Sequence, residues 1–510
     1  MIALAKLYDM VLSKRFCLWY SPKYEQAGAQ AKRGCTEQIL TIRLLIDVAR
    51  KKKRPLFVAF IDYEKAYDRV SRQKLLTYLE KKGCGQIFLK ALKNSLQNTV
   101  GKIGEHNFRA TAGVRQGAST SCPLFTYYIE PTIDAVNQIG TDSWIGETHI
   151  LLLMDDTAIV ASSLDKLKEK LTLLFQSTEA IGMSINAAKS KFIAVNDNDV
   201  RSVNILGLQL ERVPQYVYLG TPISPKSISE QVKDHINGKT SHVMKFLSFL
   251  ARHTDAPMCV KDQVWNSALK SAIFYSGETW LTNDLRPAET VYMMTLKRML
   301  GIRVTTCNDI VLAELGRSSA KAALRQHQAN FLHKLMSRQG FSDTYLSRVI
   351  NLAISERSPA GLIMKSLLDH GSNHSHIDAD LDRIKQRICT SGSTRRTTYR
   401  EINPSLTTHA IYSKELSVPE QLRIACSRMR MGSHLLRIET GRWARIPKEL
   451  RLCPCQEDIQ TEEHVLLHCR NTRQLRDNFP LLQKDTISEL FQSPNVMDIC
   501  KLCFDVLNTV

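Results

Sequence analysis

The sequence lacks the features of secreted and membrane-spanning proteins. No apolar run approaches the roughly 20 residues that a helix needs to cross a bilayer. The N-terminal stretch MIALAKLYDMVLSKRFCLWY has charges within it and is typical of an amphipathic helix, not of a signal peptide. Thirteen cysteines are scattered over 510 residues with a single close cluster, which argues against a disulfide framework and favours a reducing compartment. We therefore expect a soluble, intracellular protein.

Internal repeats, long low-complexity tracts and a balance of charge are missing as well. Lys and Arg outnumber Asp and Glu by 69 to 50, which gives a formal net charge of +19 and a pI near 9.3. Such an excess favours a polyanionic partner, with nucleic acid as the first candidate and an anionic membrane surface as the second. The length and a hydrophobic content of 43% allow two to four domains.

Helical and extended patterns alternate over the first 225 residues. A helix is expected over residues 38–53, before the strand-length run LFVAFID, and helical spacing returns at residues 72–96 and 123–138. The stretch LLLMDDTAIVA predicts a β-hairpin with Asp155 and Asp156 at its turn, followed by a helix from near Ser163 and short strands in SKFIAV and YVYLGTPI. This alternation indicates an α/β domain.

The aspartates at the ends of these strands predict a metal site. Asp62 ends the run LFVAFID, so neighbouring strands would bring it close to Asp155 and Asp156. Three converging carboxylates repel one another unless divalent cations neutralise them. Two Mg²⁺ ions held in this way can activate an attacking oxygen and stabilise a leaving pyrophosphate. An ordinary turn or helix cap is the alternative interpretation of a lone Asp-Asp pair.

Five motifs occur in the order and approximate spacing of motifs A to E of reverse transcriptases. They are FVAFIDYEKAYDRV, GVRQGASTSCPLF, LLLMDDTAIVA, GMSINAAKSKF and YLG. Together with EQAGAQAKRGCTEQI upstream, they resemble the reverse transcriptases of non-LTR retrotransposons over roughly residues 20–340. The resemblance implies RNA-directed DNA synthesis from a primer 3′-hydroxyl, primed by a nicked target DNA. It also implies an RNA template, a DNA primer or target and deoxynucleoside triphosphates as partners, and no membrane.

The resemblance assigns catalytic roles to four residues. It implies that Asp62 and Asp155 ligate both Mg²⁺ ions and that Asp156 completes the acidic cluster. Lys189 matches the motif D lysine, for which proton donation to the leaving pyrophosphate is implied; ordinary surface charge is the alternative.

The resemblance also implies contacts with nucleotide and primer. Tyr67 corresponds to an aromatic steric gate against a ribonucleotide 2′-hydroxyl, with core packing as the alternative. Arg115 matches a position that contacts phosphate, although a solvated arginine is an equal alternative. The remaining residues match the contacts to the incoming nucleotide and template, namely Gln116 and Gly117, and the primer grip, namely Tyr218, Leu219 and Gly220.

Several positions depart from the family pattern. Leu153 and Met154 precede the aspartates where an aromatic residue and alanine are usual, and Ala29 and Gln30 replace the usual Phe and Arg. Only 61 residues precede Asp62, so we expect partial fingers and an N-terminally truncated chain. A catalytically inactive remnant that binds nucleic acid is therefore the alternative function, and a two-metal nuclease is a weaker third.

A cysteine and histidine cluster near the end predicts one structural Zn²⁺. Cys453, Cys455, His464 and Cys469 have the spacing C-x-C-x8-H-x4-C, which suits a closed tetrahedral site. His468 competes with His464 for the imidazole position, and free cysteines are the alternative. Non-LTR elements often end in a similar zinc-knuckle-like motif. The preceding segment offers phosphate contacts and one stacking ring, from Arg428, Arg430, Arg437, Arg442, Arg445 and Trp443.

These patterns predict a right-hand polymerase palm of the α/β class followed by smaller parts. We expect partial fingers and palm over residues 1–225, a helical thumb over 226–340 and a linker with some helix over 341–417. A basic segment with a zinc-knuckle-like module follows over 418–475, and a helical tail over 476–510. The expected location is nuclear, with a cytoplasmic RNA-bound phase.

Overall fold

The chain folds into two compact units, and each is described by itself. The computed structural model describes residues 3–97, 100–147, 150–253, 255–371, 374–413, 416 and 418–509. Unit 1 comprises residues 1–234, 278–283 and 331–369, and unit 2 comprises residues 235–277, 284–330 and 370–510. In the described part of the chain, no helix is both long and apolar enough to cross a membrane.

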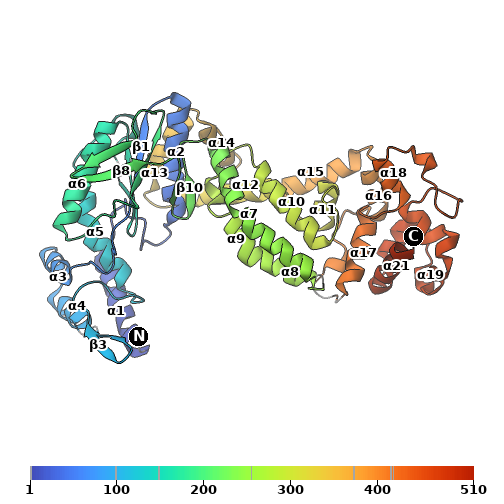
Figure 1. Cartoon of the computed structure of the whole chain (residues 1–510), viewed down its shortest axis with the longest axis horizontal. Helices are drawn as coiled ribbons and strands as arrows, with labels where there is room; N and C mark the ends of the chain where they lie inside the picture. Colours follow the sequence, from blue (N-terminus) through green and yellow to red (C-terminus); the bar gives the residue numbers. More distant parts are fainter. Residues whose placement is uncertain are drawn as a thin grey trace. The chain divides into compact units, whose positions relative to one another are not determined.

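A six-stranded sheet forms the centre of unit 1 (Figure 1). The strand order is β4-β5-β1-β6-β8-β7, and neighbours are antiparallel except for the parallel pair β6 and β8. All six residues of β1 are buried, as expected for a central strand that is covered on both faces. The strands are β1 (Leu56–Ile61), β4 (Ile150–Leu153), β5 (Asp156–Ala161), β6 (Lys191–Val195), β7 (Ser202–Ile205) and β8 (Leu208–Arg212).

Helices cover this sheet on its two faces. The alternate β1 residues Phe57, Ala59 and Ile61 belong to a core that also contains α5 (Ser121–Asn137) and α6 (Leu164–Ala180). Helix α2 (Cys35–Lys52) contacts β1, β4 and β6, and α13 (Tyr345–Ser355) and α14 (Pro359–Asp369) pack on it in turn. Because it is covered on several sides, α2 is buried along most of its length.

Shorter elements complete unit 1. An N-terminal helix, α1 (Ala3–Trp19), precedes the sheet, and α3 (Arg72–Lys81) and α4 (Gln86–Gln97) follow β1. Two hairpins, β2 (Val100–Ile103) with β3 (His106–Arg109) and β9 (Tyr216–Tyr218) with β10 (Thr221–Ile223), stand outside the main sheet. The expected α/β class of this part of the chain is therefore confirmed, including the helix at Ser163, whose hydroxyl caps α6 by accepting from the Lys166 N–H at 3.2 Å.

Unit 2 is helical, and its described residues contain no strand. Helix α17 packs against α21 over a core that includes Cys426, Met429, Leu502 and Cys503. Its main helices are the greater part of α7 (Ile228–Arg252), α8 (Met258–Val264), α9 (Lys270–Ile273), α10 (Arg286–Leu300), α11 (Asn308–Glu314), most of α12 (Ala320–Met336), α15 (His376–Thr390), α16 (Thr394–Ile402), α17 (Glu420–Arg430), α18 (Arg437–Trp443), α19 (Arg473–Asp477), α20 (Ile487–Gln492) and α21 (Val496–Thr509).

The compact units do not follow the expected segment boundaries. Residues 331–369, expected at the end of the thumb and in a linker, belong to unit 1, where α13 and α14 cover α2. The backbone N–H of Ala360 donates to the buried carboxylate of Asp47 in α2 at 2.9 Å. The two residues that this buried contact joins are more than 300 positions apart in sequence. Local sequence patterns therefore give no sign of it.

Candidate active site and cysteine–histidine cluster

The three aspartates singled out in the sequence meet at one edge of the sheet in unit 1. Asp62 directly follows β1, Asp155 lies in the turn between β4 and β5, and Asp156 opens β5. Because Ile61 pairs with Thr157, the register of the antiparallel strands β1 and β5 sets Asp62 opposite Asp156. The expected hairpin is present, but its turn consists of Met154 and Asp155, one residue earlier than predicted, because Asp156 pairs with Leu153 as the first residue of β5.

The carboxylates influence one another's ionisation. Loss of hydration raises the pKa of Asp155, and the nearby charge of Asp62 raises it further. The pKa of Asp156 is raised by the same loss of hydration and then by the charges of Asp155 and Asp62. Mutual repulsion of this kind disfavours three ionised carboxylates unless a cation lies among them. The donor set therefore fits hard divalent cations, which prefer oxygen ligands.

Lys189 lies beside the acidic cluster. Its Nζ is 3.9 Å from Asp62 Oδ2, and its side chain is 70% exposed. The segment that carries it is tied to the end of β1, because the Asp62 N–H donates to Ser190 Oγ at 3.0 Å and the Asn186 N–H donates to the Asp62 carbonyl at 2.8 Å. The ammonium group thus stays within reach of the cluster while remaining free to move.

A buried glutamine that the sequence did not reveal holds the turn before Asp155. Gln26 is fully buried, accepts from the Met154 N–H at 2.8 Å and donates to the Met154 carbonyl at 3.0 Å. This pair of hydrogen bonds supports Met154 in a left-handed conformation (φ 59°), which is uncommon for a residue with a side chain. Gly28 is needed next to the turn, since a Cβ there would lie 2.7 Å from the Met154 nitrogen.

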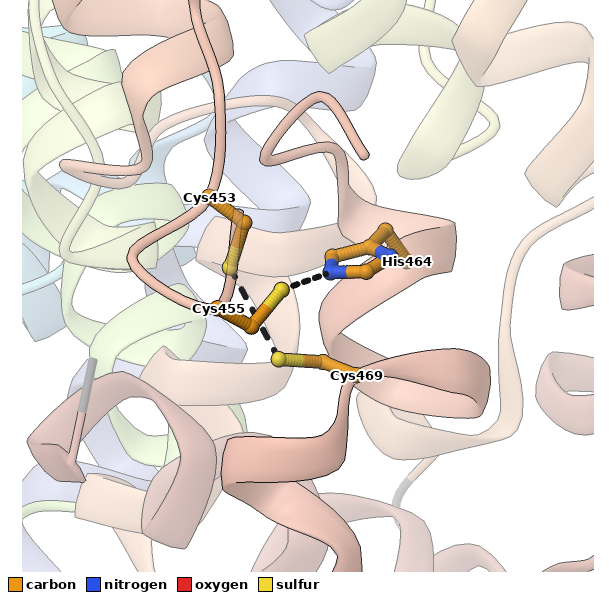
Figure 2. A group of neighbouring side chains, drawn as sticks. All are labelled: Cys453, Cys455, His464 and Cys469. Atoms are coloured by element: carbon orange, nitrogen blue, oxygen red, sulfur yellow. Dashed lines mark hydrogen bonds between the residues drawn. The ribbon is translucent and has the colours of Figure 1, made fainter. Parts of the chain in front are cut away.

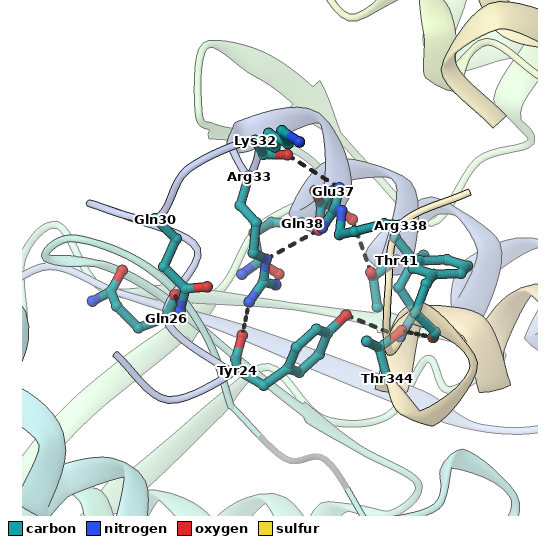
Figure 3. A network of polar contacts seen from close by, with 12 residues as sticks. Tyr24, Gln26, Gln30, Lys32, Arg33, Glu37, Gln38, Thr41, Arg338 and Thr344 are labelled. Atoms are coloured by element: carbon teal, nitrogen blue, oxygen red, sulfur yellow. Dashed lines mark hydrogen bonds and ion pairs between the residues drawn. The ribbon is translucent and has the colours of Figure 1, made fainter. Parts of the chain in front are cut away.

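The segment around Gln26 is anchored by a network of polar contacts (Figure 3). Arg33 donates to the Glu37 carboxylate at 3.2 Å, and Arg338 donates to the same carboxylate at 2.6 Å. Gln30, which stands where the family usually has arginine, donates to the carbonyls of Pro22, Lys23 and Gln26 at 3.1, 2.9 and 2.7 Å. The departure from the family pattern is therefore accommodated by local backbone contacts.

Tyr67 and the motif B loop lie next to the aspartates. The Tyr67 ring stacks on Phe125 of α5, with centroids 4.4 Å apart. Burial raises the pKa of Tyr67, and contributions from Cys122 and Asp155 raise it further, so the phenol lies near both groups. Gly113 has φ +80°, and a Cβ there would come within 3.0 Å of the Asp68 backbone. Gln116 and Gly117 are exposed at the tip of this loop.

Arg115 pairs with the N-terminal helix. Its Nη2 lies 2.9 Å from Asp9 Oδ1 and donates to Ser95 Oγ at 2.7 Å. Asp9 is completely buried and also accepts from the N–H and the hydroxyl of Thr120, at 3.1 and 2.7 Å. The two ends of the loop that presents Gln116 are thus held by one carboxylate of α1, a positioning role for which the sequence offered no signal. The assigned phosphate contact of Arg115 stays a prediction.

The predicted primer-grip residues form the β9–β10 hairpin. Tyr218 is buried against Phe60 of β1, and the neighbouring Tyr216 stacks on the same ring with centroids 4.5 Å apart. Leu219 and Gly220 make the turn with φ of 47° and 76°, the left-handed pair that a tight two-residue hairpin requires. Burial raises the pKa of Tyr216, and the charges of Asp62 and Asp156 raise it further, so the hairpin lies beside the acidic edge.

The four cysteine and histidine ligands predicted near the C-terminus come together in unit 2 (Figure 2). Their ligand atoms all lie within 4.8 Å of one another, with Cys453 Sγ 3.6 Å from Cys469 Sγ and Cys455 Sγ 3.2 Å from His464 Nε2. All four are buried, whereas His468 is exposed. The group is therefore a possible metal site, and His464 is the imidazole that faces the thiols.

Backbone turns deliver these ligands. The Cys453 N–H donates to the Asp458 carbonyl at 2.8 Å, and the Gln456 N–H donates to the Cys453 carbonyl at 2.8 Å, so residues 453–458 form a tight loop that presents both cysteines. On the other side, residues 464–468 form a single wide π-helical turn in which the Cys469 N–H donates to the His464 carbonyl at 2.7 Å.

The arginines before this cluster do not form one exposed basic surface. Arg430 is 2% exposed and donates to the buried Glu314 carboxylate at 2.5 and 3.0 Å, so the predicted phosphate contact of Arg430 is wrong. Arg437 donates to the Leu452 carbonyl at 2.9 Å, and Arg442 pairs with Glu439. Arg428 stays exposed. Most of the arginines in this segment are thus already paired with carboxylate or carbonyl groups of the chain itself.

Comparison with known proteins identifies relatives of the N-terminal part. Residues 2–210 match the family described as reverse transcriptase (RNA-dependent DNA polymerase). The Pol polyprotein of the type-1 retrotransposable element R2 of Bradysia coprophila is 24% identical over 193 residues, which are 37% of this chain and 22% of that protein. The RNA-directed DNA polymerase of the mobile element jockey of Drosophila melanogaster is 22% identical over 299 residues, 55% of this chain and 32% of that protein.

The chain thus spans between a fifth and a third of the length of these relatives. Among solved structures, the telomerase of Candida albicans in complex with a fragment of telomeric RNA covers 72% of this chain and 57% of its own, at 12% identity and a TM-score of 0.32. The telomerase of Candida tropicalis, in a similar complex, covers 75% and 56%, at 13% identity and a TM-score of 0.32.

Proposed function

We propose that this chain catalyses RNA-directed DNA synthesis from a primer 3′-hydroxyl. The premise is that residues 2–210 match the reverse transcriptase family and that the relatives of the chain come from non-LTR retrotransposons. The observation that carries the proposal is the convergence of Asp62, Asp155 and Asp156 at one edge of the sheet. The raised pKa values of the last two support it, because loss of hydration and repulsion between the carboxylates disfavour their ionised forms unless a cation lies among them.

The three aspartates would hold two Mg²⁺ ions, which when bound activate the primer hydroxyl and stabilise the leaving pyrophosphate. Gln26 keeps the Asp155 turn in a fixed conformation, so that the carboxylates are positioned before substrate arrives. Lys189, beside Asp62, is in reach to donate a proton to the pyrophosphate.

Selection of the nucleotide is assigned to Tyr67 and the motif B loop. The stacking of Tyr67 on Phe125 fixes the ring next to Asp155, where it would clash with a 2′-hydroxyl. Gln116 and Gly117 are exposed for contact with nucleotide and template, with Arg115 as a further phosphate contact, and the Tyr218–Gly220 turn is assigned to the primer end. An RNA template, a nicked DNA target as primer and deoxynucleoside triphosphates are the proposed partners.

Primer extension tests this function. With poly(rA)/oligo(dT), dTTP and Mg²⁺, the chain should extend the primer, and Asp155→Asn should lower the rate by roughly 10³-fold, because a metal ligand contributes several kcal/mol of charge stabilisation. Asp165→Asn, at an exposed position in the first turn of α6, is the matched control and should extend normally. A folded, RNA-binding chain without extension would instead establish a nucleic-acid-binding remnant.

We also propose that Cys453, Cys455, His464 and Cys469 hold one structural Zn²⁺. Zinc bonds of about 2.3 Å to sulfur and 2.0 Å to nitrogen, at tetrahedral angles, place two thiolates about 3.8 Å apart and a thiolate and nitrogen about 3.5 Å apart. The distances of 3.6 and 3.2 Å between these ligand atoms fit that geometry.

Metal analysis of the purified full chain tests the zinc proposal. One equivalent of zinc is expected, and Cys455→Ser should lose it. Cys389→Ser, at an exposed cysteine outside the cluster, should retain the metal. Full zinc content in the Cys455 variant would rule out this ligand set.

A further inference from the structure

A cavity of about 770 Å³ lies in unit 2, within the size range of ligand pockets. The end of α10 and the turn after it form one wall, at Arg298 and residues 301–305. The other walls come from α17 at Ile424 and Arg428, from residues 433–436, and from the last turn of α21 at residues 507–508. The cavity is called the α10–α17 pocket below.

The charge around the pocket is unbalanced. Arg298, Arg303 and Arg428 line it, and no Asp or Glu is among its described lining residues. In the described part of the chain, neither Arg298 nor Arg428 pairs with a carboxylate. A fourth cation, Lys261, is already paired with Glu420, which it shares with Arg423. Arg298 and Arg428 therefore lack a carboxylate partner among the described residues, and Arg303 has Glu439 nearby without forming an ion pair with it.

Arg303 is held rigidly in this position. Its backbone N–H donates to Ser433 Oγ at 2.8 Å, its Nη2 donates to the His434 carbonyl, and its guanidinium lies 4.0 Å from the ring centroid of Trp443. Its Nη1 is buried and has no hydrogen-bond partner among the described residues. A fixed guanidinium with an unused buried donor is suited to an anionic oxygen, since it loses little conformational entropy on binding.

Neighbouring cations increase the need for an anion. Burial lowers the pKa of Arg303, Glu439 offsets part of this, and the charges of Arg395 and Arg428 lower it further. Glu439 is itself paired with Arg395 and Arg442, so its charge is shared among several arginines. An anion bound between Arg303 and Arg428 would relieve this repulsion.

Apolar side chains complete the pocket. Ile302, Ile424, Leu436 and Leu507 line it, and Val304 and Leu435 are exposed large apolar residues at its surface. A flat apolar group combined with a phosphate matches this lining better than a simple inorganic anion does. Nucleotides have that combination, because each has a base with a stacking face next to a charged phosphate.

We propose that the α10–α17 pocket binds a single-stranded nucleic acid, with backbone phosphates on Arg298, Arg303 and Arg428 and a base against the apolar lining. The inference rests on the proposed function for the class of ligand and goes beyond it in assigning a binding site outside the reverse transcriptase domain. The site joins residues that are more than 120 positions apart in sequence, such as Arg303 and Ser433.

Fluorescence anisotropy of the full chain with fluorescein-labelled oligo(rU), titrated with KCl, tests the proposal. Arg298→Gln/Arg428→Gln should weaken binding roughly tenfold and reduce the slope of log K against log[salt] by about 1.4, because each phosphate contact on a single strand contributes about 0.7. Lys385→Gln/Lys484→Gln removes the same charge at two exposed positions of unit 2 and should change binding little. Equal losses in the two double variants would overturn the assignment.

A second variant separates the cavity from its charge. Val304 is 71% exposed, so Val304→Trp should fold while partly filling the pocket. It should weaken oligo(rU) binding and leave the salt slope unchanged, and unaltered binding would overturn the proposal. A different outcome would be that the arginine double variant binds UMP more weakly than the wild type does but binds oligo(rU) equally well. The site would then bind a free nucleotide, and its assignment to a nucleic-acid strand would be wrong.

Primer extension distinguishes this inference from the proposed function. At saturating poly(rA)/oligo(dT), the pocket variants should extend primers, whereas Asp155→Asn should bind oligo(rU) without extending. Normal extension together with unchanged oligo(rU) binding in the pocket variants would overturn only the proposed pocket site. Weakened oligo(rU) binding in those variants, with no extension by the wild type, would overturn only the proposed polymerase function.

Discussion

Single buried polar residues decide how the candidate active site is held. Gln26 bonds both backbone groups of Met154, and Asp9 bonds both Arg115 and Thr120 around the motif B loop. Neither side chain is expected to touch substrate, so both are positioning residues. The aspartates were recognisable from the sequence because they stand at strand ends. Gln26 and Asp9 do not stand at the ends of strands.

Gln26→Ala should both destabilise the fold and slow the polymerase. It leaves three backbone groups without these partners, namely the partly buried N–H and carbonyl of Met154 and the N–H of Gly28, so the free energy of unfolding should fall by about 2 kcal/mol. The extension rate should fall as well, since the Asp155 turn loses its fixed conformation. Chemical denaturation and primer extension measure the two effects, and Gln176→Ala, at an exposed position of α6, is the control. Normal extension by Gln26→Ala would refute the positioning role.

At the scale of elements, an irregular segment acts as an extra strand beside β4. The Ala27 N–H donates to the Leu152 carbonyl at 2.8 Å, and the Leu152 N–H donates to the Glu25 carbonyl at 2.9 Å. Only a residue without a side chain fits at Gly28, where the segment passes the Met154 turn. Strand β4, which leads into the turn that carries the aspartates, is thus held at both of its edges, by β5 and by residues 25–28.

Gly28→Ala should disturb this pairing and reduce extension. Its Cβ would lie 2.7 Å from the Met154 nitrogen, a contact that the backbone can relieve only by moving away from β4. Gly34→Ala is the matched control, because a Cβ there meets nothing within 4 Å and its extended backbone suits any residue. Equal activity of the two variants in primer extension would show that the approach at Gly28 is not required.

At the scale of the whole molecule, buried charge pairs contribute to the stability of unit 2. Glu314 of α11 accepts from Arg430 of α17 and, at 2.8 Å, from the Tyr399 hydroxyl. Arg430→Met should cost about 3–5 kcal/mol of unfolding free energy, because it leaves a buried carboxylate unpaired. Glu314→Gln/Arg430→Met should cost less than the single variant in chemical denaturation. A larger loss in the double variant would contradict this account.

The same pair predicts how stability depends on pH. Burial alone would raise the pKa of Glu314, but Arg430 and Tyr399 hold it below the ordinary value. A folded-state pKa below the unfolded one gives stability that is present above the unfolded pKa, about 4.3, and is lost as pH falls through the folded value. Denaturation between about pH 6 and pH 3 should show this loss in the wild type and a smaller one in Glu314→Gln.

The sequence by itself determined the α/β class, the main helices and several strands of the first 225 residues, and the residues grouped at the acidic edge and in the cysteine cluster, but it did not predict the β2–β3 and β7–β8 hairpins. It could do so because alternating hydrophobic patterns and short motifs are local. Only the tertiary structure decided that Arg430 is buried against Glu314, that Gln26 and Asp9 position the site, and that Arg298, Arg303 and Arg428 share a cavity. The contacts of Arg430, Gln26 and Asp9 join residues more than 100 positions apart, and the cavity brings Arg428 to Arg298 and Arg303 from a distant part of the chain. These partners are chosen by packing, which no local pattern encodes.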